Sequence, residues 1–325
     1  MIIVKSPLRI SLGGGGTDLP NYFNKYGGFT VSMAIDKFVT IVINKNLKNR
    51  FEIKYSEYEK SKNIVGIKHN IVRECLKLFK VKEGLEISSF SDVPHGTGLG
   101  SSGAFTVCLL KGMYEYYNRK ISQKKLALLA FKIERKILKQ PVGYQDQISS
   151  SYGGITKQVY RKNKILITKM KLNKRLKTII SKNFLLVYTG IQRDSKKILY
   201  LQEKLTKQNN KNIIENLNKI KQNGRKVYNL IINKNLSGYG KYLTSHWEAK
   251  KKLNKKTINR KTNKIINLCL KNGAEGCRIV GAGAGGYVLV YGRKLQKITN
   301  RLSYKKIVYT SFNLDNEGAR LIYKK

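Results

Sequence analysis

The sequence has few acidic residues, cysteines and histidines, and it lacks long hydrophobic runs. Its four cysteines show no C-x-x-C or other metal-binding spacing, and its three histidines lie far apart, so neither type predicts a metal cluster. No apolar run approaches the roughly 18 residues of a membrane-spanning helix, and the N-terminus has no apolar signal segment. We therefore expect reduced cysteines in a cytoplasmic protein that has no membrane partner.

Acidic residues are so scarce that the chain is strongly basic. It contains 19 Asp and Glu against 65 Lys and Arg, a formal net charge of +46. Such a charge is typical of nucleic-acid-binding proteins. However, Lys recurs with Asn and Ile in almost every segment, and the basic residues form neither a tail nor a motif with stacking aromatics. We interpret the charge as a solvated Lys surface that speeds association with anionic substrates, with no specific nucleic-acid partner.

The length allows two domains, which we expect at residues 1–180 and 181–325, and the periodicity predicts a mixture of helices and strands. A chain of 325 residues with 41% hydrophobic residues is long for one core. β-Branched and aromatic runs predict strands, and apolar residues at helical spacing predict helices. The expected strands are 2–4, 30–35, 39–44, 51–55, 85–90, 155–160, 165–168, 184–188, 287–291 and 307–309, with another around Arg278. The expected helices are 71–79, 104–117, 124–138 and several between 194 and 272.

Residues 94–104 (PHGTGLGSSGA) form the most informative motif of the chain. Glycines let backbone N–H groups turn toward one anion, and serines add hydroxyls, one of which can cap the helix that follows. The start of that helix adds partial positive charge, so the motif predicts a phosphate cradle. It is not a P-loop, because Ser101 rather than Lys follows Gly100.

Two further glycine-rich segments lie at 13–18 (GGGGTD) and 281–286 (GAGAGG). The second matches G-x-G-x-x-G, but a β-branched and aromatic run follows it, where a dinucleotide-binding fingerprint requires a helix. Three glycine-rich loops in one chain are hard to explain as turns alone.

The order of motifs at 7–18, 94–104 and 279–286 resembles the GHMP small-molecule kinases, the family of galactokinase, homoserine kinase and mevalonate kinase. The resemblance spans nearly the whole chain, and its most specific part is 94–104. The G-G-G-T-D run is most similar to the sugar-1-kinase branch that includes heptose 7-phosphate kinases. The resemblance implies a two-domain α+β fold, with ATP and substrate bound in the cleft between the domains.

The resemblance also implies the residues of the kinase reaction. ATP and Mg²⁺ are the expected cofactors, and Ser102 and Glu134 match the family's metal ligands. Asp146, in a G-x-x-D-Q segment, matches the acid beside the acceptor hydroxyl, and Arg9 matches its basic partner. Two alternatives stay open: Glu134 as an exposed helix carboxylate and Asp146 as a helix cap. The sequence also leaves open whether Asp146 takes the proton or orients the hydroxyl. The expected ATP-binding residues are Pro94, Gly96, Gly98, Leu99, Gly100, Ser101 and Ser102.

The substrate is expected to be a small sugar phosphate. Galactokinase has an acidic residue and a histidine where this chain has Gly15 and Gly16, so a larger or differently held sugar is favoured over galactose. Arg193 follows a predicted strand and begins a predicted helix, which suits a second, substrate-borne phosphate; the alternative is a surface Arg. The expected substrate-binding residues are Gly14, Gly15, Gly16, Thr17, Asp18, Arg193 and Gly283.

Together these expectations define an ATP-dependent kinase for the anomeric hydroxyl of D-glycero-D-manno-heptose 7-phosphate. Its product would be the 1,7-bisphosphate, a precursor for nucleotide-activated heptose. A kinase for a free sugar such as L-fucose is the alternative within enzymes, and a basic nucleic-acid-binding protein is the alternative from another class. The sequence predicts no oligomeric state.

Overall fold

The first half of the chain is built on an eight-stranded sheet with two long strands at its centre. In the computed structural model, which describes residues 1–192, 195–253 and 259–325, β1 (Ile2–Gly13) and β2 (Gly28–Lys45) pair along nearly their whole length. The C-terminal half of β2 pairs with β5, and its N-terminal half pairs with β6. The sheet order is β12-β1-β2-β5-β3-β4, with β6 and β7 branching from β2. The other strands are β3 (Phe51–Lys54), β4 (Tyr58–Ser61), β5 (Leu85–Ser91), β6 (Ile155–Arg161), β7 (Lys164–Met170) and β12 (Arg320–Lys324).

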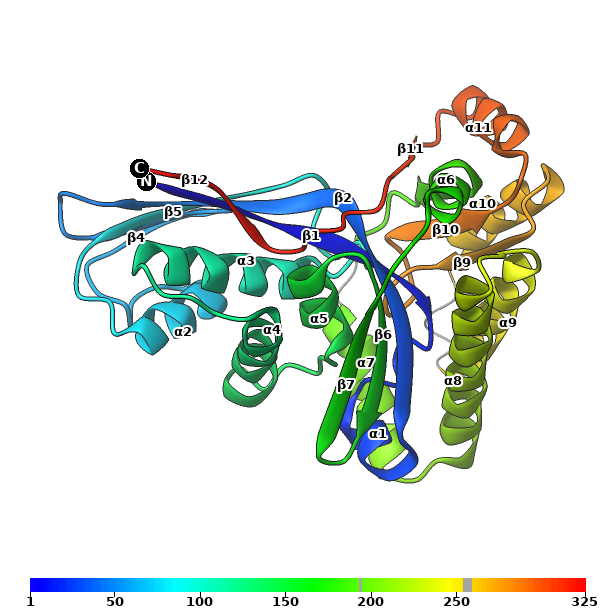
Figure 1. The fold of residues 1–325 in the computed structure, drawn as a ribbon, viewed down its shortest axis with the longest axis horizontal. Helices are drawn as coiled ribbons and strands as arrows, with labels where there is room; N and C mark the ends of the chain where they lie inside the picture. The colour runs from blue at the N-terminus through cyan, green and yellow to red at the C-terminus, as the bar shows by residue number, and fades with distance from the viewer. Residues whose placement is uncertain (193–194, 254–258) are drawn as a thin grey trace.

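Helices cover one face of this sheet (Figure 1). The central one, α3 (Ser101–Tyr116), packs on β1 and β2 and is apolar on most sides, because the sheet and its neighbouring helices surround it. The predicted helix 124–138 is interrupted: α4 ends at Phe131 and a π-helical turn, η1, follows. The other helices are α1 (Pro20–Tyr26), α2 (Asn70–Phe79), α4 (Gln123–Phe131), η1 (Lys132–Ile137) and α5 (Gln145–Tyr152).

The second half is a four-stranded antiparallel sheet, ordered β11-β8-β10-β9, with helices around it (Figure 1). Its strands are apolar on both faces, since one face packs on helices and the other joins the core of the first half. The strands are β8 (Phe184–Tyr188), β9 (Gly276–Ile279), β10 (Tyr287–Tyr291) and β11 (Tyr309–Thr310). The helices are α6 (Lys174–Asn183), α7 (Ser195–Lys207), α8 (Lys211–Ile232), α9 (Tyr239–Leu253), α10 (Arg260–Lys271) and α11 (Leu295–Tyr304).

The end of the chain returns to the first sheet. β12 pairs antiparallel with β1, beginning at Ile2 and Lys324, so the two termini lie side by side (Figure 1). The predicted second domain, 181–325, includes this segment, although its strand completes the first sheet. A division near residue 180 remains our prediction for the rest of the chain.

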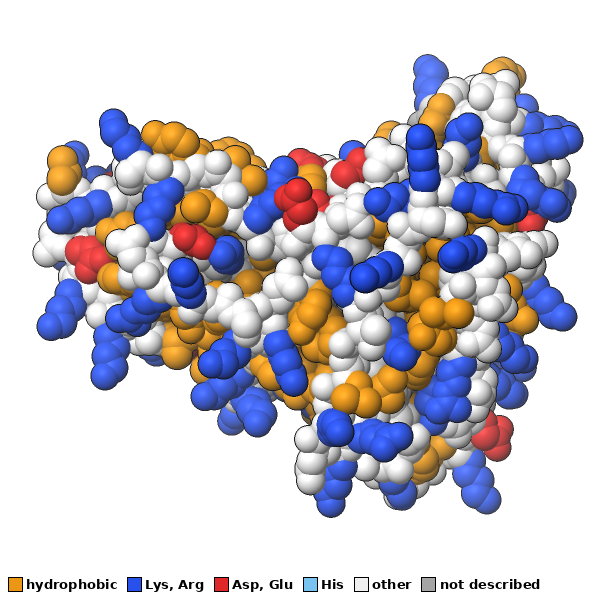
Figure 2. All heavy atoms as spheres, viewed as in Figure 1, with side chains coloured by type: hydrophobic (Ala, Val, Ile, Leu, Met, Phe, Trp, Pro, Cys, Tyr) orange, Lys and Arg blue, Asp and Glu red, His pale blue; other side chains and the backbone are white. Residues whose placement is uncertain are grey.

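Three further features of the structure concern the cysteines, the helices and the charged surface. All four cysteines are free and buried, as predicted. Among the described residues, no helix is long and apolar enough to cross a membrane. Figure 2 shows Lys and Arg scattered over both halves of one face rather than gathered in one patch.

Candidate active site

A cavity of about 1170 Å³ lies between the two halves of the molecule. All three glycine-rich motifs reach it: the first through Gly15 and Gly16, the second through residues 94–96, 98 and 100–103, and the third through Gly281 and Ala282. Three sequence segments that are far apart therefore meet around one space, as expected of a binding site rather than of three unrelated turns.

The phosphate cradle of residues 94–104 has the backbone that its glycines predict. Gly96, Gly98 and Gly100 have φ values of 71°, 87° and 77°, a region that side chains with a Cβ rarely adopt. Gly100 precedes the first turn of α3, and no side chain caps that helix. The prediction that a serine caps it is wrong, because the glycine itself holds the cap position. The first N–H groups of α3 are therefore left for a ligand at the cavity.

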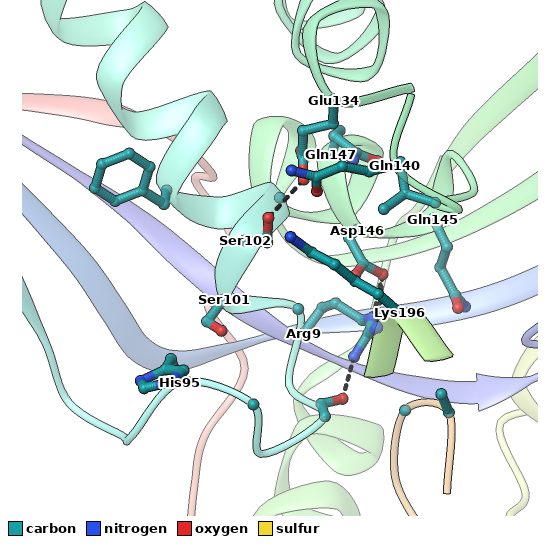
Figure 3. Close-up of a pocket in the computed structure, with 18 of the residues that line it drawn as sticks. Arg9, His95, Ser101, Ser102, Glu134, Gln140, Gln145, Asp146, Gln147 and Lys196 are labelled. Carbon is teal, nitrogen blue, oxygen red and sulfur yellow. Dashed lines mark hydrogen bonds and ion pairs between the residues drawn. The ribbon is translucent and has the colours of Figure 1, made fainter. Parts of the chain in front are cut away.

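Arg9 and Asp146 form an ion pair at the centre of the cavity (Figure 3). Arg9 comes from β1 and Asp146 from the first turn of α5; the Arg9 Nη2 to Asp146 Oδ1 distance is 2.6 Å, and Arg9 Nε donates to the same oxygen at 2.7 Å. Arg9 Nη1 also donates to the carbonyl of Gly98 at 2.7 Å. The buried arginine thus fixes the carboxylate against the phosphate loop, while the Asp146 side chain keeps 31% exposure.

Ser102 and Glu134 lie together beside this pair (Figure 3). Ser102 Oγ donates to Glu134 Oε2 at 2.6 Å, and Gln147 Nε2 donates to Oε1 at 2.9 Å. The π-helical turn directs Glu134 inward, where its side chain is fully buried. Burial raises the pKa of Glu134, and the two hydrogen bonds offset this only in part. Glu134 is therefore not the exposed helix carboxylate that the sequence left open.

The oxygen atoms of this pair fit a hard divalent cation such as Mg²⁺. A buried carboxylate with a raised pKa gains by facing a cation, and hydroxyl and carboxylate oxygens are suitable ligands. Across residues 1–192, 195–253 and 259–325, no group of three His, Cys, Asp or Glu side chains could hold a metal ion. Mg²⁺ commonly keeps several waters and substrate phosphates as ligands, so it needs few ligands from the protein.

The raised pKa of Glu134 predicts a pH-dependent stability difference. The pKa of Glu134 in the folded protein lies above the ordinary value of 4.5, so the native state binds the proton more tightly than the unfolded state. Its contribution to the free energy of unfolding therefore falls as pH rises from the unfolded value through the folded one. Glu134→Gln lacks this effect, so the variant should gain stability relative to the unmodified protein as pH rises above the ordinary pKa of 4.5.

Urea unfolding without Mg²⁺ or nucleotide, at several pH values, measures this difference. The other titratable groups are common to both proteins and cancel to first order. A difference in unfolding free energy that stays constant with pH would show that Glu134 is not held in the buried, proton-binding environment described above.

On the acceptor side, Asp18 is buried at the wall of the cavity. It accepts N–H bonds from Gly16 at 3.1 Å and from Gln145 at 3.0 Å, and burial raises its pKa. A Cβ at Gly143 would lie 2.0 Å from Asp18 Oδ2, and one at Gly15 would lie 2.7 Å from Ser11 Oγ. These glycines leave room for polar side chains, so the wall can present oxygen acceptors to a ligand with hydroxyls.

Four predicted site residues do not line the cavity. The buried Thr17 hydroxyl bonds to the carbonyls of Gly14 and Phe29 and shapes its own turn, which leaves nothing for a sugar. The Leu99 side chain is in the core, and its carbonyl accepts the Arg9 backbone N–H at 2.9 Å. The residues not brought to the cavity are Gly14, Thr17, Leu99 and Gly283. Arg193 lies outside the described residues.

The third glycine-rich loop supports the phosphate cradle. The backbone N–H of Tyr287 bonds to the Thr97 carbonyl at 3.2 Å, and a Cβ at Gly286 would lie 2.1 Å from that oxygen. The close approach explains a glycine before a strand, where the sequence pattern alone indicated only a failed dinucleotide fingerprint.

Several cavity residues were not predicted from the sequence. Lys196, from α7, extends into the cavity in Figure 3, and Gln147 contacts Glu134. With 65 Lys and Arg in the chain, no local signal distinguishes one functional lysine.

At the end of the cavity beyond the phosphate loop, His69 stacks on Phe105 with ring centroids 4.9 Å apart and meets Tyr55 edge-on at 4.6 Å. This end offers flat aromatic surfaces.

Comparisons with known proteins agree with this geometry. Residues 70–154 match the family of GHMP kinases, N terminal domain. The chain is 27% identical to D-glycero-alpha-D-manno-heptose 7-phosphate kinase of Campylobacter jejuni, over 98% of both chains. It is 27% identical to a galactokinase of Pyrococcus furiosus, over 88% of this chain and 87% of that protein. Its fold matches the crystal structure of a D-glycero-D-manno-heptose 1-phosphate kinase from Bacteroides thetaiotaomicron, with TM-score 0.81, 21% identity and full coverage of both chains. The predicted resemblance, α+β fold and kinase class are confirmed.

Proposed function

We propose, from the GHMP kinase N-terminal domain that this chain carries at residues 70–154, that the protein is an ATP-dependent kinase of a sugar phosphate. The acceptor is D-glycero-D-manno-heptose 7-phosphate, and the group phosphorylated is its anomeric hydroxyl. One observation carries the proposal: Arg9 binds Asp146 and the phosphate loop at once, so a carboxylate for an acceptor hydroxyl stands beside a cradle for the donor phosphates. The similarity over 98% of a heptose 7-phosphate kinase supports this choice of sugar.

The cavity provides distinct places for donor and acceptor. ATP would lie with its phosphates on the glycines of residues 94–103 and on the first turn of α3, and its base toward the aromatic end at His69 and Phe105. Ser102 and Glu134 would hold Mg²⁺, which neutralises charge on the transferring phosphoryl group when bound. The sugar would occupy the wall formed by Gly15, Gly16 and Asp18.

Phosphoryl transfer needs positioning and charge neutralisation more than covalent chemistry by the protein. Asp146 holds the acceptor hydroxyl by accepting its hydrogen bond, and it orients that oxygen toward the donor or takes its proton as the bond to phosphorus forms. Arg9 keeps the carboxylate in place. Lys196, which enters the cavity from α7, adds positive charge near the donor phosphates.

A substrate comparison tests the proposal. We expect ADP release with heptose 7-phosphate to exceed that with unphosphorylated heptose or L-fucose by roughly 10- to 100-fold in kcat/KM, since charge-assisted bonds to a phosphate are worth about 1.5–3 kcal/mol. Release should persist at moderate salt, where purely electrostatic attraction is screened.

Two other results would redirect the proposal. Equal kcat/KM for heptose and heptose 7-phosphate would move a free sugar such as L-fucose to first place. Absence of any sugar-dependent ADP release, together with salt-sensitive RNA binding, would instead favour a nucleic-acid-binding role. The scattered basic side chains of Figure 2 give that role no defined surface on the face shown.

A further inference from the structure

Arg278 is a buried cation at the wall of the cavity, contributed by the central part of β9. It pairs across the sheet with Leu289, is 1% exposed, and lines the cavity beside the third glycine-rich loop. Its Nη2 donates to the backbone carbonyl of Ser11. Its Nε has no hydrogen-bond partner in the described part of the chain. An unsatisfied donor on a buried guanidinium is costly, so its position calls for an acceptor.

Helix α9 places two more polar side chains at the same spot. His246 and Lys250 are four residues apart, on one face of the helix, and both are buried. Lys250 lines the cavity and donates to the Gly281 carbonyl. Neither ring nitrogen of His246 has a hydrogen-bond partner among the described residues. Burial and the charges of Arg278 and Lys250 lower the pKa of His246 well below its ordinary value, so the ring is neutral at pH 7.

The acidic groups of the acceptor side are occupied elsewhere. Asp146 pairs with Arg9, and Asp18 accepts the backbone N–H groups of Gly16 and Gln145. Within residues 1–192, 195–253 and 259–325, no carboxylate forms an ion pair with Arg278. Arg278 and Lys250 therefore give this part of the cavity positive charge, and Arg278 Nε is a donor without a partner in the described residues, which favours an anionic ligand.

This cationic cluster lies along β1 from the reacting centre. Arg278 is bonded to Ser11, which is two residues beyond Arg9 on the same strand, about 6.6 Å away at the usual strand rise. Ser11 Oγ in turn accepts a bond from Gln145, the neighbour of Asp146. An acceptor whose hydroxyl meets Asp146 can thus extend past Ser11 toward Arg278.

We propose that Arg278 and Lys250 form the binding site for a phosphate group at the far end of the acceptor, with the buried His246 beside them. The proposal rests on the proposed function, in which the acceptor is a sugar phosphate. A guanidinium presents a planar fork that matches two phosphate oxygens, and Lys250 adds a point charge. His246 is not among the residues that line the cavity, and its neutral ring adds no charge to the site. The site fixes specificity for a phosphorylated sugar.

Steady-state kinetics with two acceptors tests the site. The kcat/KM values for heptose 7-phosphate and for unphosphorylated heptose are measured for the unmodified enzyme and for Arg278→Gln, Arg278→Lys and Lys250→Met. We expect Arg278→Gln to lower kcat/KM for the phosphorylated sugar by about 10- to 100-fold, mostly by raising KM. The same variant should lower kcat/KM for unphosphorylated heptose much less. Arg278→Lys should recover part of the loss. Arg293→Gln, at an exposed arginine paired with Glu275, is the matched control and should behave as the unmodified enzyme.

Each other outcome has a definite meaning. Equal losses for both sugars in Arg278→Gln and Lys250→Met, or a preserved preference for the phosphorylated sugar, would overturn the site. If Arg278→Gln does not fold, as judged by its thermal transition, Lys250→Met alone decides. Arg193→Ala is measured in parallel, and loss of the preference in that variant only would place the phosphate at Arg193. No turnover of heptose 7-phosphate by the unmodified enzyme would contradict the proposed function itself, and with it this site.

Discussion

Asp146→Asn is expected to lower kcat by at least roughly 100-fold while the KM for ATP stays within a factor of about three. The substitution preserves the shape of the side chain and part of its hydrogen bonding, but it removes the charge that accepts the hydroxyl proton or orients that oxygen. In the proposed function, ATP binds through the glycine-rich loop that lines the cavity and through the first turn of α3, which do not depend on this charge. Steady-state kinetics with saturating sugar measures the effect.

Loss of the Arg9 ion pair could also disturb the loop, so a control is needed. Arg9 retains its bond to the Gly98 carbonyl in the variant, which holds the loop from its other side. Asp36→Asn alters a carboxylate that bonds only to Asn313 in the described residues, and it should leave kcat unchanged. Near-normal turnover in folded Asp146→Asn would remove Asp146 from the catalytic residues.

Ser102→Ala and Glu134→Gln are expected to share one defect, a requirement for at least about tenfold more Mg²⁺ at fixed ATP. Both side chains supply hard oxygen to the same ion in our account, and the 2.6 Å bond between them shows that they reach one point. Glu134→Gln should have the larger effect, because it removes a buried negative charge, whereas Ser102→Ala removes a neutral ligand. Titrating Mg²⁺ against initial rate measures both.

The matched control is Glu248→Gln, at an exposed carboxylate paired with Lys251 on α9. It should titrate with Mg²⁺ as the unmodified enzyme does. An unchanged Mg²⁺ dependence in Glu134→Gln would show that Glu134 acts only as a buried hydrogen-bond acceptor for Ser102 and Gln147, and the predicted metal ligand set would be wrong.

Local patterns predicted much of the fold. The helix at 70–79, the strand at 85–91, the hairpin of β6 and β7 and the strands β8 and β10 lie where periodicity placed them. Their signals are local, since apolar spacing and turn residues decide each one. The pairing of β12 with β1 joins residues more than 300 positions apart, and no pattern within either strand specifies it.

In the candidate site, too, some residues could be predicted from the sequence and others could not. The glycines of the phosphate loop follow from a motif with chemical meaning. The roles expected of Arg9, Asp146, Ser102 and Glu134 come from the resemblance to the GHMP kinases. Thr17 could not be judged from its motif, because its hydroxyl bonds to Phe29, on a neighbouring strand. Arg278 was recognised only as part of a strand, since a buried cation and a solvated one look the same in a chain with so many basic residues.

The inward position of Glu134 has a similar cause. The apolar spacing predicted a regular helix over 124–138, but a π-helical turn at Lys132–Ile137 interrupts it. Such turns depend on packing around them and are frequent at functional sites. Sequence periodicity alone therefore left open whether this carboxylate faced solvent or the cavity.

The position of the new phosphate in the product tests the central claim most directly. The purified protein is incubated with ATP, Mg²⁺ and D-glycero-D-manno-heptose 7-phosphate, and the product is analysed by ³¹P NMR with coupling to protons. Our account predicts a second phosphorus signal coupled to the anomeric proton, formed in step with ADP and lost in Asp146→Asn. A new phosphate on any other carbon, or ADP formation without a phosphorylated sugar, would contradict it.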